Sequence, residues 1–175
     1  MKAIAIGGVP ATGKTTLVKA MLNLLKPDQQ IKYGMLRGSK SGDNVVFGIY
    51  ESGDTFAGTD RLSMAVQKHY DSYMEKKMSN IVFEGDRLFT GNNICKLIHE
   101  YETRVVILEA EEKVLDQRHI DRQDNQGATF LKSRYTKIHN ICKIPEVQDY
   151  IERHSLMVQE DTQRLSQELV DWLNS

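Results

Sequence analysis

Cysteine is scarce in this chain, since only Cys95 and Cys142 occur among 175 residues. The two are not spaced as C-x-x-C and fall in different expected helices, so neither a zinc site nor a disulfide framework is predicted. This usage is typical of a reducing cytosol, and we expect a cytoplasmic protein. No apolar stretch reaches the roughly 18–20 residues that span a bilayer, so we expect no membrane partner.

An excess of charge of one sign is also missing. The chain has 23 Lys and Arg against 24 Asp and Glu, a formal net charge of −1. No overall basic field therefore indicates nucleic acid, although a local basic groove is compatible with this balance. The length suits one domain over residues 1–175 with a substantial core.

What the sequence does contain begins near its start. Residues Gly8–Thr15, GVPATGKT, match G-x-x-x-x-G-K-[ST] at every fixed position. The apolar run 3–6 before them predicts a buried strand, and the apolar spacing over 17–25 predicts a helix after them. In that context glycines let successive backbone N–H groups curl around phosphates at a helix N-terminus. We therefore expect a site for ATP.

Each residue of this loop has an expected role. Lys14 is expected to place its ammonium on the outer phosphates and to act in catalysis, and Thr15 to offer its hydroxyl to Mg²⁺. The other residues expected to surround the phosphates are Gly8, Ala11, Thr12, Gly13 and Thr16.

Strand-like and helix-like segments alternate along the rest of the chain. The expected strands are 31–38 and 44–51, joined as a hairpin, then 80–83, 104–110 and 155–158. The expected helices are 62–73, 94–101, 111–120, 131–142 and 160–173. This alternation predicts an α/β protein of three layers with a central, mostly parallel sheet.

Three classes of nucleotide-binding protein compete for such a loop. A GTPase needs a base-reading N-K-x-D, which the sequence lacks. A motor or AAA-type ATPase usually carries apolar residues followed by Asp-Glu, whereas residues 81–86 here read IVFEGD. A kinase has positive support, because Arg118 and Arg122 follow a strand and its helix and lie four residues apart.

In nucleotide kinases, which this segment resembles, such a pair of arginines lies at the start of a mobile lid. The lid would here cover residues of about 118–134. One guanidinium, that of Arg118, would stack on adenine, and the other, that of Arg122, would reach the phosphates. Arg134 lies beyond the polar loop 121–128 and is expected to return to the transferred phosphoryl group, whose charge grows in the transition state. The alternative is a solvated face in which nearby aspartates pair with these arginines.

Carboxylates follow the strand 80–83. A carboxylate at the carboxyl end of a parallel strand points into the crevice where ligands bind. A kinase uses one there to accept the proton of the attacking hydroxyl or to hold Mg²⁺. Which of Glu84 and Asp86 is the base stays open; Asp86 is favoured, with Glu84 nearer the metal. Arg87 is expected to orient the acceptor, and the other expected acceptor-binding residues are Arg37, Asp60 and Arg61.

The whole chain resembles the P-loop kinase superfamily through GVPATGKT, EGD and R-x-x-x-R. A narrower likeness lies in FAGTDRLSMAVQ (56–67), the EGDR turn and DRQDNQGATFLKSRYTKI (121–138). These segments resemble phage kinases that phosphorylate 5-hydroxymethyluracil within DNA. The resemblance implies transfer of the γ-phosphoryl group of ATP to that base, a DNA-modifying role and the host cytoplasm. The alternatives are a free deoxynucleoside monophosphate kinase and a non-catalytic ATP-binding regulatory module.

Overall fold

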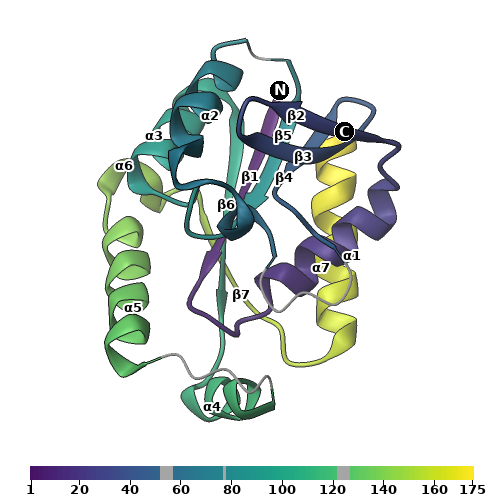
Figure 1. Ribbon diagram of the computed structural model, residues 1–175. Helices are drawn as coiled ribbons and strands as arrows, with labels where there is room; N and C mark the ends of the chain where they lie inside the picture. The colour runs from purple at the N-terminus through teal and green to yellow at the C-terminus, as the bar shows by residue number, and fades with distance from the viewer. Residues whose placement is uncertain (52–56, 77, 122–126) are drawn as a thin grey trace.

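The computed structural model describes residues 1–51, 57–76, 78–121 and 127–175 (Figure 1). The predicted lid residue Arg122 lies outside these ranges. The strands are β1 (Lys2–Gly8), β2 (Gln29–Tyr33), β3 (Leu36–Ser41), β4 (Asn44–Phe47), β5 (Asn80–Glu84), β6 (Glu102–Glu109) and β7 (Ile151–Ser155). The helices are α1 (Lys14–Leu25), α2 (Gln67–Met74), α3 (Gly91–Glu100), α4 (Glu112–Asp121), α5 (Ala128–Cys142), α6 (Pro145–Gln148) and α7 (Gln159–Asn174).

The strands form one sheet in the order β2-β3-β4-β5-β1-β6-β7. The pairs from β4 to β7 are parallel, and the two pairs within β2-β3-β4 are antiparallel. The mostly parallel sheet predicted from the sequence is therefore confirmed. β1 lies between β5 and β6, so the loop after β1 starts at the middle of the sheet, where the ends of both neighbours surround it.

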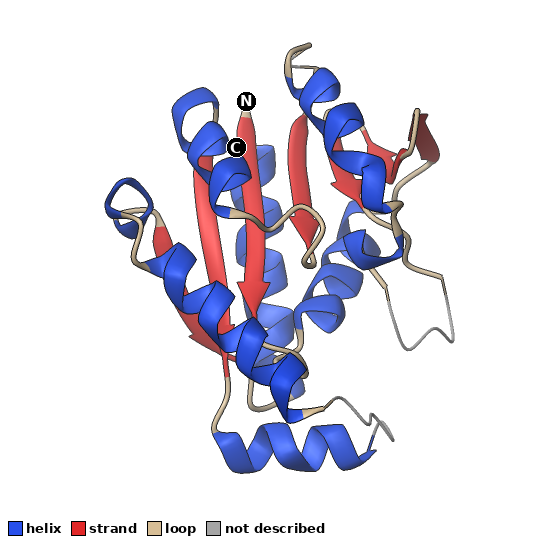
Figure 2. Cartoon of the chain, turned by 60° about the vertical axis from the view of Figure 1, so that its left-hand side comes forward, coloured by secondary structure: helices blue, strands red, loops and turns tan. Residues whose placement is uncertain are grey.

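Helices cover both faces of the sheet, which makes the three predicted layers (Figures 1 and 2). Alternate residues of β1 serve the two sides because side chains of a strand point to opposite faces. Ala3 and Ala5 belong to the core shared with α2 and α3, whereas Ile4 and Ile6 belong to the core shared with α1 and α7. Every one of these four side chains is fully buried, so β1 is held rigidly under the loop.

Four predicted boundaries are wrong. The expected strand 44–51 ends as β4 at Phe47, before Gly48, whose φ is 125°. The expected strand 31–38 is divided by a turn at Gly34, whose φ of 58° ends β2 and starts the β2–β3 hairpin. The expected last strand 155–158 is instead β7, placed four residues earlier, because its polar sequence IERHS forms an edge strand without an apolar run. The expected helix 62–73 begins later, after the 3₁₀ helices Thr59–Arg61 and Met64–Val66.

Cys95 lies in α3 and Cys142 in α5, and neither forms a disulfide. None of the described helices combines the length and the apolar character that crossing a membrane requires.

Candidate active site

The loop between β1 and α1 has left-handed backbone at three positions, with φ of 142° at Gly8, 64° at Ala11 and 99° at Gly13. A Cβ atom at Gly8 would lie 2.5 Å from the backbone oxygen of Leu108, so only glycine fits there. The first helical hydrogen bond runs from the Leu17 N–H to the Gly13 oxygen, at 2.9 Å. The N–H groups of the first turn have no partner within α1 and add positive charge at the loop, which suits an anion.

Two side chains of the loop contact its own backbone. The Lys14 ammonium donates to the carbonyl oxygens of Gly8 and Val9, each at 2.9 Å, and so lies across the loop where phosphates are expected. The Thr12 hydroxyl donates to the Val9 oxygen at 2.9 Å and is fully buried. Thr12 therefore stabilises the loop with its side chain.

Thr15 and Glu84 come together from adjacent elements. Glu84 ends β5, where it is paired in register with Ile6 of β1, and Thr15 lies in the first turn of α1. The Thr15 hydroxyl donates to Glu84 Oε1 at 3.0 Å, and the Glu84 side chain is buried. Burial raises the pKa of Glu84 to about 7, against the opposing pull of the Lys14 ammonium. A hydroxyl next to a buried carboxylate fits Mg²⁺, which typically takes one or two protein oxygens and completes its shell with phosphate and water.

Because Glu84 is buried, we expect Glu84→Gln to raise the free energy of unfolding by an amount that depends on pH. The unfolded chain releases the Glu84 proton near pH 4.5 and the folded protein only near pH 7, so stability is lost as pH rises through this window. We expect the substitution to raise the free energy of unfolding by roughly 2 kcal/mol more at pH 8 than at pH 5, at about 1.4 kcal/mol per pKa unit.

Urea unfolding without nucleotide or Mg²⁺ measures this difference at the two pH values. Glu102→Gln removes an exposed carboxyl at the start of β6 and serves as the matched control. An effect of Glu84→Gln that is equal at both pH values would contradict the burial of an ionisable carboxyl beside the loop.

Asp60 and Asp86 complete a group of three carboxyls at the end of β5. Asp60 accepts a hydrogen bond from the backbone N–H of Asp86 at 2.7 Å. Its neighbour Thr59 donates to the backbone oxygen of Glu84, also at 2.7 Å, which fixes the 3₁₀ helix against the strand. Burial raises the pKa of Asp60, and the nearby charge of Asp86 raises it further.

Two cations of α5 hold Asp86. Arg134 Nη1 lies 2.5 Å from Asp86 Oδ2, and Lys137 Nζ lies 3.2 Å from Asp86 Oδ1. Lys137 also donates to the Asp86 backbone oxygen at 2.9 Å, and the Arg134 guanidinium lies over the Phe130 ring at 4.4 Å. α5 therefore brings positive charge to the end of β5.

These groups line one cavity of about 130 Å³. Its lining includes Lys14 and Thr15 from the loop, the carboxyls of Asp60, Glu84 and Asp86, the rings of Phe89 and Phe130, and Arg134. The loop thus meets carboxylates and a cation within one small space.

Three of the predicted acceptor-binding residues are not among the described residues that line this cavity. Arg61 pairs with Glu51 at 3.0 Å. Arg37 is exposed on β3 and lines another cavity, because alternation along the strand turns it away from the β5 end. Arg87 directs its guanidinium to the Met64 sulfur. Of the four predicted residues, Asp60 is the one that the structure places beside the loop.

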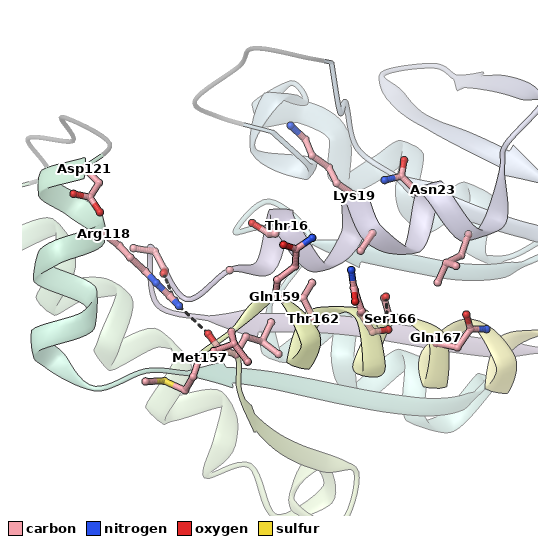
Figure 3. Close-up of a pocket in the computed structure, with 17 residues that line it drawn as sticks. Thr16, Lys19, Asn23, Arg118, Asp121, Met157, Gln159, Thr162, Ser166 and Gln167 are labelled. Carbon is pink, nitrogen blue, oxygen red and sulfur yellow. Dashed lines mark hydrogen bonds between the residues drawn. The ribbon is translucent and has the colours of Figure 1, made fainter.

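A second, larger cavity of about 1000 Å³ lies on the other side of the loop. Figure 3 shows Arg118 reaching into it from α4, with Thr16 and Lys19 of α1 and Gln159 of α7 on its walls. Arg118 donates to the backbone oxygens of Ala11, at 3.0 Å, and Leu156, at 2.8 Å. The guanidinium therefore links α4 to the loop and to the segment before α7.

Lys137 and Phe89 belong to the site although no motif marks them. Lys137 reaches Asp86 across 51 positions of sequence, and Phe89 is a buried aromatic whose ring would lie 2.2 Å from a Cβ at Gly7. The weak sequence signals are the spacing of Arg134 and Lys137, three positions apart on one helix, and the glycine that makes room for the ring.

Solved structures similar to this chain include a gluconokinase and two shikimate kinases. A gluconokinase from Sinorhizobium meliloti 1021 is 12% identical with a TM-score of 0.53, covering 99% of this chain and 95% of its own. A shikimate kinase from Bacteroides thetaiotaomicron is 16% identical with a TM-score of 0.49, covering 99% and 98%. Shikimate kinase from Acinetobacter baumannii in complex with shikimate is 13% identical with a TM-score of 0.46, covering 99% and 92%.

No protein-family model and no curated protein matches the chain. At such low identity the gluconokinase structure shows the fold alone, and that fold is the P-loop kinase-like fold predicted from the sequence. The narrower resemblance to phage 5-hydroxymethyluracil DNA kinases is not confirmed.

Proposed function

We propose that this protein is an ATP- and Mg²⁺-dependent kinase that transfers the γ-phosphoryl group to a hydroxyl of a nucleotide-type acceptor. One observation carries the proposal. Lys14 and Thr15 of the loop line the same cavity as the buried Glu84 and the ion-paired Asp86. A phosphate loop, a metal-binding carboxylate and a candidate base are the parts that phosphoryl transfer requires.

The larger cavity is the proposed nucleoside site. With the phosphates in the loop, the adenosine would lie beside Thr16 and Arg118, which line this cavity. Arg118 uses its N–H groups on two backbone oxygens, which leaves a planar face suited to stacking on adenine. Lys14 would exchange the carbonyls of Gly8 and Val9 for phosphate oxygens, which are stronger partners for an ammonium.

Thr15 and Glu84 are the proposed metal-binding residues. Mg²⁺ held there would supply charge neutralisation between the β- and γ-phosphates. Glu84 would be ionised when the cation is present, because a nearby positive charge favours the carboxylate.

Asp86 is the proposed base, and Glu84 is the second candidate. The Asp86 side chain is more exposed than that of Glu84. The Asp60 carboxylate holds the Asp86 backbone by accepting a hydrogen bond from its N–H. Arg134 and Lys137 both pair with the Asp86 carboxylate and hold it at the end of β5. Arg134 lies close enough to the loop cavity to turn to the transferred phosphoryl group. Arg122 is proposed to join it when a lid over about 118–134 closes and excludes water.

The resemblance of residues 56–67 and 121–138 supports 5-hydroxymethyluracil in DNA as the acceptor, and a free deoxynucleoside monophosphate is the alternative. The exposed ring of Phe130, which lines the small cavity, suits a flat base. A non-catalytic ATP-binding module would not need an ion-paired carboxylate facing the phosphate loop. We place the enzyme in the cytoplasm, as one domain over residues 1–175.

Label transfer from γ-labelled ATP tests the acceptor. We expect ADP to form only when acceptor is added, with label in 5-hydroxymethyluracil-containing DNA and none in thymine DNA, which lacks the hydroxyl. Label in the free monophosphate alone would refute the DNA acceptor and keep the kinase. ADP production that is the same with and without every acceptor, or none at all, would contradict the proposed transfer.

A further inference from the structure

Two cations face each other on the β2–β3 hairpin. Lys32 of β2 lies directly opposite Arg37 of β3 in the antiparallel register, and both are exposed. Opposed residues hold their Cβ atoms roughly 4.5–5.5 Å apart, where like charges are destabilising. Within the described part of the chain, no hydrogen bond or ion pair involves either side-chain cation. This repulsion is relieved when an anion lies between the two.

Lys32 and Arg37 line a cavity of about 700 Å³ between the hairpin and the end of α1. Further donors share this lining: the amides of Asn23 and Gln30 and the hydroxyl of Ser39, which accepts from Gln30 at 3.1 Å. Glu51 is the one carboxyl among the described lining residues, and Arg61 holds it at 3.0 Å. The cavity thus presents two cations and several neutral donors to a ligand.

The backbone around Gly58 separates this cavity from the candidate active site. Ile49, which lines it, exchanges two backbone hydrogen bonds with Gly58, at 3.1 and 2.9 Å. Gly58 in turn packs so tightly on Glu84 that a Cβ would lie 2.2 Å from Glu84 Oε1. Figure 1 shows β2 and β3 at one edge of the sheet, on the same side of the molecule as α1.

We propose that Lys32 and Arg37 bind a phosphate group at this second site, separate from the loop Gly8–Thr15. The ammonium supplies a compact charge and the guanidinium a planar pair of donors, a combination that suits phosphate oxygens. Lysine on the edge strand β2 also discourages pairing with another sheet, but Arg37 lies on an inner strand, where that purpose does not apply. The phosphate belongs either to a small phosphorylated ligand or to a polynucleotide backbone.

The test is a titration of the ¹⁵N-labelled protein, followed by the shifts of its backbone amides. The probes are inorganic phosphate, thymidine monophosphate and a short single-stranded oligonucleotide. We expect shifts at residues 30–32 and 37–39 that saturate independently of any shifts at residues 8–16. Lys32→Gln and Arg37→Gln should each weaken binding at 30–39 about tenfold, as loss of one charged hydrogen bond does.

Lys40→Gln is the matched control, because it removes the same charge from β3 on the opposite face of the strand. If the oligonucleotide binds more tightly than the small anions and its binding depends steeply on salt, the phosphate belongs to a polynucleotide. If the small anions bind as well as the oligonucleotide, the phosphate belongs to a small ligand. Absence of shifts at 30–39 with all three probes, or an equal loss in Lys40→Gln, would overturn the proposal. The amide shifts of residues 8–16 show separately whether a probe binds at the proposed ATP loop, so failure of one site can be told from failure of the other.

Discussion

Lys14→Ala should lower turnover at least about a hundredfold, the usual cost of removing one preorganised group that stabilises transition-state charge. In the free protein the ammonium is held by the carbonyls of Gly8 and Val9, directly over the loop. It is therefore already placed where negative charge grows on the phosphates during transfer. Alanine leaves this charge to the backbone N–H groups and to the metal.

The fold should tolerate this substitution. The Val9 oxygen keeps the hydrogen bond from the Thr12 hydroxyl, and Gly8 is partly exposed to water. We therefore expect a change in the free energy of unfolding within about 1 kcal/mol. Lys113→Ala removes an exposed lysine of α4 and should leave turnover unchanged. Steady-state ADP production and urea unfolding measure the two effects. Near-normal turnover of Lys14→Ala would contradict the proposal that this protein is a kinase.

Asp86→Asn is expected to lower turnover by about a hundred- to ten-thousandfold, the range that general base catalysis contributes. Asparagine keeps the shape of the side chain but cannot accept the proton of the acceptor hydroxyl. ATP affinity should change little, because the loop and the Thr15–Glu84 pair remain. The ion pairs with Arg134 and Lys137 are partly exposed, so their loss should cost no more than about 1 kcal/mol of stability.

A companion variant separates loss of the base from loss of its ion pairs. Lys137→Met removes one cation from Asp86 and keeps the carboxylate, so turnover should fall far less than in Asp86→Asn. Single-turnover rates at saturating ATP, with ATP affinity measured in parallel, compare the two. Equal losses would make Asp86 a structural residue, and a normal rate in Asp86→Asn would assign the base to Glu84.

Local patterns were sufficient to predict the centre of the fold. The loop Gly8–Thr15 follows a buried strand and begins a helix, and each of these features depends on residues adjacent in sequence. Glu84 was predictable at a strand end because the apolar run before it is short and clearly bounded. The edge strand β7 was misplaced, since an edge position leaves its sequence IERHS without the apolar pattern of an inner strand.

The partners of charged side chains could not be predicted from the sequence. Arg61 and Arg37 have the charge that an acceptor requires, yet one pairs with Glu51 and the other lines a separate cavity. Nothing near Asp86 in sequence indicates that α5 will hold it, because that contact depends on how α5 packs across the sheet end. Residue type predicts the chemistry of a site, whereas the topology decides which side chains meet.

A crystal structure with Mg²⁺ and a non-hydrolysable ATP analogue would show whether the loop and the end of β5 form one phosphoryl-transfer site. We expect adenine in the cavity beside Arg118, phosphates in the loop Gly8–Thr15 and Lys14 moved from the loop carbonyls to phosphate oxygens. We also expect Mg²⁺ at Thr15 and Glu84, with the γ-phosphate facing Asp86. A nucleotide bound elsewhere, or a γ-phosphate directed away from the end of β5, would contradict this expectation.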